Sequence, residues 1–156
     1  MKLLYRETNE EFKAEILELE ERDFDMINKS GQFEFDWSME KTNHVFKIVR
    51  KSAEENREIF GLLSVINISE EFRIHINLIE NSNKNKGRNK KIDGIAGCLI
   101  AFATRLSFEK GYLGFTSLVP KTELIELYVK KYGFSQYGRQ LAIEREASRD
   151  LIQKYL

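Results

Sequence analysis

The sequence contains a single cysteine and a single proline among its 156 residues. One cysteine cannot form a disulfide within the chain, so no disulfide framework supports the fold. The charges balance, with 25 Lys and Arg against 25 Asp and Glu, which argues against a general nucleic-acid binder. No apolar run is long enough to span a bilayer, and the first residues lack the apolar core of a signal peptide. We therefore expect a protein of a reducing, cytoplasmic compartment with no membrane association.

What is present is the composition of a globular protein. Hydrophobic residues make up 42% of the chain and aromatic residues 12%, which is enough apolar surface to build a core. No internal repeat and no low-complexity linker interrupts the sequence. The length fits one domain, so we expect a single domain over residues 1–156.

The first third of the chain predicts a helix followed by a loop. Thr8 and Glu11 have the spacing of a capping box, and apolar residues then recur at helical intervals. This pattern predicts a helix over residues 8–26. The aromatic but weakly periodic residues 30–43 are expected to form a loop and a short strand.

The rest of the chain alternates between strand and helix patterns. Three strands with short polar connections indicate an antiparallel meander. The last of them, a long helix and the next strand form a right-handed crossover, so those two strands should be parallel. We expect an α/β (α+β) fold with a mixed, largely antiparallel central sheet flanked by helices. The predicted elements are strands at 45–49, 59–68 and 71–80, a helix at 93–109, a strand at 112–119, a helix at 121–132, a bent strand or strand pair at 134–144 and a helix at 147–155.

A candidate anion site lies at the strand-to-helix junction Lys91-Ile92-Asp93-Gly94-Ile95-Ala96-Gly97. A helix start exposes unpaired amides and the positive end of the helix dipole. Gly94 has no side chain to keep a pyrophosphate away from the backbone. The loop before it, residues 81–91, is polar and basic, although most of its side chains are expected simply to be solvated.

This segment resembles the signature of the GNAT superfamily of acetyl-CoA-dependent N-acetyltransferases, Arg/Gln-x-x-Gly-x-Gly/Ala, with Lys91 in the first position. The later Leu127-Tyr128-Val129-Lys130-Lys131-Tyr132-Gly133-Phe134 is similar to the end of the next helix in that family. The resemblance implies the acyl-CoA N-acyltransferase fold, in which the sheet is splayed between the two adjacent parallel strands. It also implies acetyl-CoA as cosubstrate, with the pantetheine arm beside the first parallel strand. The cofactor-binding residues it implies are Leu78, Ile79, Arg88, Lys91, Ile92, Asp93, Gly94, Ile95, Ala96 and Gly97.

The chemistry implied is direct attack of an amine on the thioester, without a metal. An amine must lose a proton before it attacks, and general-base help accelerates such a step. Glu80 is the first candidate for the base and His75 the second. Tyr128 is the candidate acid for the leaving thiolate, with Tyr132 as the alternative because the helix register is open. Cys98, inside the helix, has no activating neighbour and is expected to be a buried hydrophobe.

Three functions fit these observations. The first is an N-acetyltransferase acting on an amine that the sequence does not identify. The second is a non-catalytic CoA-binding or regulatory module of the same fold. The third is an acetyltransferase associated with RNA or aminoacyl-tRNA, motivated by the basic loop but opposed by the balanced charge. Both a monomer and a homodimer remain open.

Overall fold

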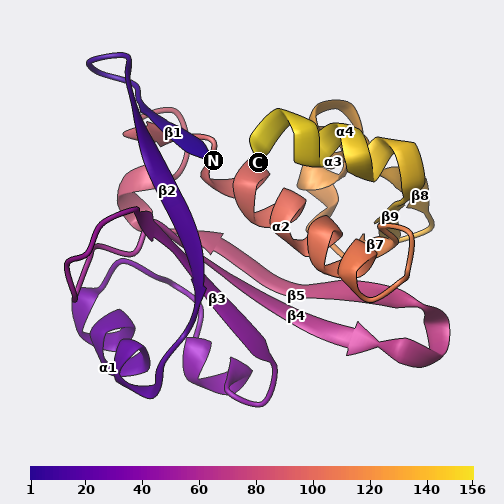
Figure 1. Ribbon diagram of the computed structural model, residues 1–156, viewed down its shortest axis with the longest axis horizontal. Coiled ribbons are helices and arrows are strands. Elements are labelled where there is room, and N and C mark those ends of the chain that lie inside the picture. Colours follow the sequence, from indigo (N-terminus) through magenta and orange to yellow (C-terminus); the bar gives the residue numbers. More distant parts are fainter. The chain divides into compact units, whose positions relative to one another are not determined.

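A computed structural model describes all of residues 1–156 (Figure 1). Nine strands form one sheet in the order β6-β1-β2-β3-β4-β5-β7-β9-β8. No helix combines the length and the apolar character that a bilayer crossing requires. The strands and helices are β1 (Lys2–Tyr5), β2 (Glu10–Glu18), α1 (Glu21–Ser30), β3 (His44–Arg50), β4 (Gly61–Ile68), β5 (Arg73–Asn81), β6 (Ile92–Asp93), α2 (Ile95–Glu109), β7 (Thr116–Leu118), α3 (Ile125–Tyr132), β8 (Ser135–Tyr137), β9 (Gln140–Ile143) and α4 (Arg145–Tyr155).

The predicted fold class is confirmed by the pairing of β5 with β7. These two strands are parallel, from Ile74 opposite Thr116 to Ile76 opposite Leu118, while β1, β2 and β3 pair antiparallel, as do β7, β8 and β9. Strand β7 ends at Leu118 but β5 runs on to Asn81. The last residues of β5 therefore extend beyond the parallel pairing.

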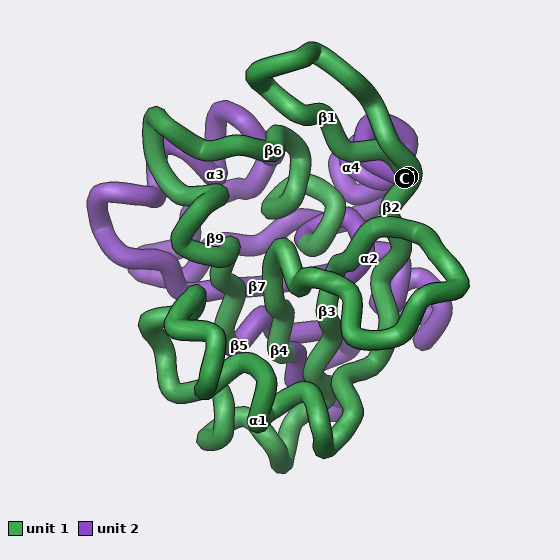
Figure 2. Tube along the Cα trace, turned by 90° about the vertical axis from the view of Figure 1, so that its left-hand side faces the viewer, with its two compact units in different colours: residues 1–64, 78–99 green, residues 65–77, 100–156 purple.

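The chain divides into two compact units, residues 1–64 with 78–99 and residues 65–77 with 100–156 (Figure 2). Strands β4 and β5 and helix α2 each contribute residues to both units. The expectation of a single domain remains a prediction.

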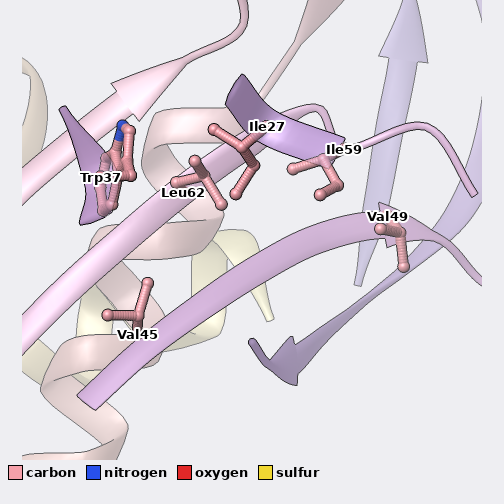
Figure 3. Packing of buried hydrophobic residues seen from close by; sticks show 6 residues of the cluster. All are labelled: Ile27, Trp37, Val45, Val49, Ile59 and Leu62. Carbon is pink, nitrogen blue, oxygen red and sulfur yellow. The ribbon is translucent and has the colours of Figure 1, made fainter. Parts of the chain in front are cut away.

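The core of the first unit forms around Trp37, which is completely buried. Trp37 lies in a short 3-10 helix within the stretch expected to be a loop and a short strand, and the predicted short strand does not form there. Figure 3 shows it with Ile27 of α1, Val45 of β3 and Leu62 of β4. Val49 and Ile59 complete this cluster.

The predicted helix over residues 8–26 is wrong, because a hairpin of β1 and β2 occupies most of that segment. Thr8 accepts a hydrogen bond from the amide of Glu10 in the turn, and Asn9 adopts a left-handed conformation with φ of 58°. Along β2, Phe12 and Ala14 are buried with an exposed residue between them, which is the two-residue period of a strand. Pairing with β3, a segment distant in sequence, overrides the local helical spacing.

In the second unit, Gly114 marks the close approach of α4 to the end of α2. A Cβ atom there would lie 2.7 Å from both Phe108 and Ser148, and the Ser148 hydroxyl donates a hydrogen bond to the Gly114 carbonyl at 2.8 Å. The residue also has a φ of 77°, so only glycine fits without strain. The elements after residue 109 otherwise follow the predicted order, with the strand pair as β8 and β9.

Candidate functional site

Glu80, near the end of β5, is a buried carboxylate surrounded by donors. Its side chain accepts hydrogen bonds from the Trp37 indole at 2.9 Å and from the backbone amides of Glu34 at 2.7 Å and Phe35 at 3.3 Å. The ammonium group of Lys86 lies 2.6 Å away, and Glu80 is only 4% exposed. The Glu80 carboxylate thus connects the end of strand β5 to the loop that carries Trp37 through these hydrogen bonds.

These contacts decide how the Glu80 carboxyl titrates. Burial alone would raise its pKa, but the hydrogen bonds from Lys86, the Glu34 amide, the Trp37 indole and the Phe35 amide outweigh burial and lower the pKa below its ordinary value. A general base works best with a pKa near the working pH. The hydrogen bonds of Glu80 therefore fit a structural role in holding the loop. They give no support to the predicted role of Glu80 as a general base.

His75 lies near the start of β5, opposite Ser117 of β7. Its Nδ1 atom is 2.8 Å from the Ser117 hydroxyl oxygen. Burial, followed by the positive charge of Arg73, lowers the pKa of His75 below its ordinary value of 6.5. The imidazole is therefore mainly neutral at neutral pH.

Helix α3 carries both candidate tyrosines, and both rings are buried. Tyr128 packs against Tyr132 and Phe134 with ring centroids 5.7 Å apart in each pair. Burial raises the pKa of the Tyr128 phenol, so it stays protonated and able to donate a proton. The structure records no hydrogen bond to the Tyr128 hydroxyl. Gly133 ends the helix at a φ of 82°, as predicted.

The predicted anion site lies where β6 meets α2. The first intrahelical hydrogen bond runs from the Cys98 amide to the Gly94 carbonyl, so the amides of Ile95, Ala96 and Gly97 have no partner within the helix. Ile95 is 1% exposed, while Ala96 is only half-buried. The turn before the helix needs glycine, because Gly94 has a φ of 99°.

The structure gives a backbone reason for glycine at position 94, whereas its role in admitting a pyrophosphate stays a prediction. A Cβ atom at this position would point toward the N-terminal hairpin, 3.4 Å from the Leu3 side chain and 3.9 Å from the Lys2 carbonyl oxygen. These are ordinary van der Waals separations, so the need for glycine comes from the backbone turn, with its φ of 99°. Ala96 is half-buried in the first helical turn.

The hairpin holds the anion segment from one side. Strand β1 pairs with β6, and the Arg6 amide donates to the Lys91 carbonyl at 2.9 Å. The Arg6 guanidinium donates to the Arg88 carbonyl at 2.8 Å and lies 3.7 Å from the Asp93 carboxylate. Sequence reasoning missed this support because it placed a helix over residues 8–26, where β2 lies, and assigned no strand to residues 2–5.

Asn85 organises the loop before the anion segment. It is 1% exposed, its side-chain oxygen accepts from the Ile92 amide at 3.0 Å and its side-chain nitrogen donates to Ser82 at 2.8 Å. The Asn81 side chain in turn donates to the Asn85 carbonyl at 3.3 Å. This loop therefore links the end of β5 to the start of α2. No sequence signal separates Asn85 from the other asparagines of the loop.

Most of the basic side chains in this loop are paired. Lys84 lies 3.8 Å from Glu58, Lys86 2.6 Å from Glu80 and Lys90 3.2 Å from Asp93. Arg88 and Lys91 are exposed, and they are the predicted cofactor-binding cations that remain available to a phosphate. Pairing reduces the positive surface that a nucleic acid would need.

The remaining predicted residues are placed as follows. Leu78 and Ile79 are both half-buried, so the regular alternation of burial along β5 breaks just beyond its pairing with β7. Cys98 is fully buried, and burial raises the pKa of its thiol to about 11. A thiol with that pKa is almost entirely protonated at neutral pH and is a poor nucleophile.

Neither a protein family nor a curated protein matches this sequence. Solved structures do match its fold. A spermidine N-acetyltransferase chimera from Vibrio cholerae and hSSAT superimposes with a TM-score of 0.61 at 14% identity, covering 90% of this chain and 98% of that one. The NatC complex bound to Gag peptide and CoA gives a TM-score of 0.57 at 14% identity, covering 85% of this chain and 99% of that one.

Nourseothricin acetyltransferase also matches, with a TM-score of 0.51 at 16% identity over 65% of each chain. These structures share the GNAT fold, so the resemblance read from the Lys91–Gly97 signature is confirmed at the level of the fold. Identities this low establish the fold of the chain, and its activity rests on its own residues.

Proposed function

We propose that this protein is an N-acetyltransferase that moves an acetyl group from acetyl-CoA to an amine. The observation that carries the proposal is the start of α2, where three amides have no partner within the helix and the preceding loop carries the exposed cations Arg88 and Lys91. Such a helix start suits a pyrophosphate group. The CoA named in the NatC structure, which shares the fold, supports a cosubstrate of the same type. We further propose that the protein acts in the cytoplasm.

The pantetheine arm would lie along the end of β5, at Leu78 and Ile79. In the reaction, the amine nitrogen attacks the thioester carbonyl carbon. A C–N bond forms, the C–S bond breaks, the amine loses a proton and CoA leaves as a thiolate that takes up a proton. The buried, protonated thiol of Cys98 favours this direct transfer over an acyl-enzyme.

Calorimetric titration of the purified chain with acetyl-CoA and with CoA tests the cosubstrate. We expect micromolar binding of both, because the nucleotide and pyrophosphate are common to them. Release of free thiol on addition of a panel of primary amines then tests the transfer. Folded protein that binds neither compound would contradict the proposal.

The second candidate is a CoA-binding module without turnover. It is favoured by one observation, which is that the first candidate base, Glu80, has its carboxylate occupied by four donors. Cosubstrate binding without thiol release across the amine panel would support this module. It would argue against the transferase.

Tyr128 is the proposed acid for the departing thiolate. Its hydroxyl has no recorded partner and its raised pKa keeps it protonated. We expect Tyr128→Phe to lower kcat by about a hundredfold, within the usual range for a lost general acid, and to leave the affinity for acetyl-CoA unchanged. Tyr132→Phe, on the same helix, is the matched control and should keep kcat close to that of the unaltered protein. A larger loss for Tyr132→Phe would assign the role to Tyr132.

A further inference from the structure

A chain of polar contacts runs across β5 and β7 to His75. The Arg73 guanidinium lies 2.6 Å from the Glu71 carboxylate and donates through NH1 to the Ser117 hydroxyl oxygen at 2.6 Å. That hydroxyl is 2.8 Å from Nδ1 of His75. Ser117 is completely buried. Each member therefore depends on the others for its hydrogen bonds.

The direction of these hydrogen bonds follows from what each group can do. Arginine has only donors, so the Ser117 oxygen must accept from Arg73. The single O–H hydrogen of Ser117 then has one recorded acceptor, Nδ1 of His75. If Nδ1 carried a hydrogen instead, the buried Ser117 hydroxyl would be left without an acceptor, and an unsatisfied buried donor costs more than a hydrogen bond gains.

Neutral imidazole carries its hydrogen on one nitrogen only. We infer that Ser117 and Arg73 are positioning residues that hold His75 in the neutral Nε2–H tautomer, so that His75 offers the proposed reaction a hydrogen-bond donor and not a base. Such a donor suits an oxygen acceptor, for example a carbonyl or hydroxyl group of a bound substrate. This use of His75 rests on the proposed function, whereas the tautomer itself does not.

The charged surroundings favour the same state. Arg73, on the same strand, has NH1 3.4 Å from Nδ1 of His75, so protonation there would place two positive groups in contact. Glu71, the next charged group, is paired with Arg73 and exposed. Ser117, which faces the imidazole from β7, is uncharged.

Nitrogen NMR of the full chain labelled with ¹⁵N-histidine tests the tautomer without any cosubstrate. The exposed His44 is the only other histidine and serves as the internal reference. We expect His75 to show a protonated Nε2 and an unprotonated Nδ1 at neutral pH, and its pKa to lie below the ordinary value of 6.5. A spectrum in which Nδ1 carries the hydrogen would overturn the inference.

Two variants separate positioning from mere packing. Ser117→Ala removes the O–H donor and should shift His75 toward a mixture of tautomers, while Ser117→Thr keeps a hydroxyl and should preserve the single form. Identical His75 spectra in the unaltered protein and in Ser117→Ala would overturn the inference. This NMR readout needs no turnover. Failure of the tautomer inference can therefore be distinguished from failure of the proposed acetyltransferase function.

The role in the reaction is tested with His75→Gln, which can donate a hydrogen bond but cannot titrate near neutral pH. We expect the pH profile of kcat/KM to keep its shape and kcat to stay within about tenfold of its original value. A loss of about a hundredfold or more, typical of a missing general base, with unchanged acetyl-CoA affinity would show that His75 is the base after all. That result would overturn the donor role while leaving the transferase intact.

Discussion

Replacement of Glu80 by alanine is expected to lower the free energy of unfolding by about 1–3 kcal/mol, the usual cost of leaving a buried hydrogen-bond donor unsatisfied. The change would leave the Trp37 indole and two backbone amides without their acceptor and would leave Lys86 without its 2.6 Å partner. Urea denaturation followed by Trp37 fluorescence measures the effect, since Trp37 is the only tryptophan.

Glu34→Ala provides the matched control for that experiment. The Glu34 carboxylate lies 3.7 Å from the same ammonium group but its side chain is 74% exposed, so its removal should change stability by less than about 1 kcal/mol. Equal effects of the two alanine variants would show that the buried network around Glu80 does not hold the loop.

The Glu80 contribution should also depend on pH in a defined direction. Because the folded-state pKa of this carboxyl is lowered from about 4.5, its stabilisation is fully present above that value and is lost as the pH falls through the folded-state pKa. The stability difference between the unaltered protein and Glu80→Gln should thus be constant near neutral pH and shrink in acid.

The second large effect is expected at the start of α2. Ala96→Glu places a carboxylate in front of the amides proposed to hold the pyrophosphate. At an effective dielectric constant near 20, two like charges about 5 Å apart repel by about 3 kcal/mol, so the affinity for acetyl-CoA should fall by roughly a hundredfold. The fold should be retained, because an acidic side chain in the first turn favours a helix.

Ala96→Gln is the control, since glutamine has the size of glutamate without its charge. Any steric obstruction is common to both variants, and calorimetric titration of the two with acetyl-CoA isolates the charge. Equal affinities for the Glu and Gln variants would place the anion elsewhere and would remove the main support for the proposed function.

The parts of the fold that the sequence predicts correctly are those indicated by residues close together along the chain. Gly133 ends α3, and the parallel pairing of β5 with β7 follows from the handedness of one crossover. The hairpin of β1 and β2 escaped prediction because its partner strand β3 lies about 30 residues away along the chain, and local spacing carries no information about it.

The same limit applies to the candidate site. The Lys91–Gly97 signature identified the helix start because that chemistry is contained in seven neighbouring residues. The environment of Glu80 depends on donors 45 or 46 residues earlier, and that of His75 on Ser117, 42 residues later. Residue type suggested a base at both positions, whereas only the packed structure shows which lone pairs are already in use.

The loop centred on Asn85 has a consequence for the energetics of association. Its backbone and side-chain hydrogen bonds fix residues 82–92 from within, through Asn85, Ser82 and Ile92. The conformational entropy of this segment is therefore lost when the protein folds, and not when a ligand binds. An anion arriving at α2 would meet a preceding loop that is already ordered, and little of its interaction energy would be consumed in ordering that loop.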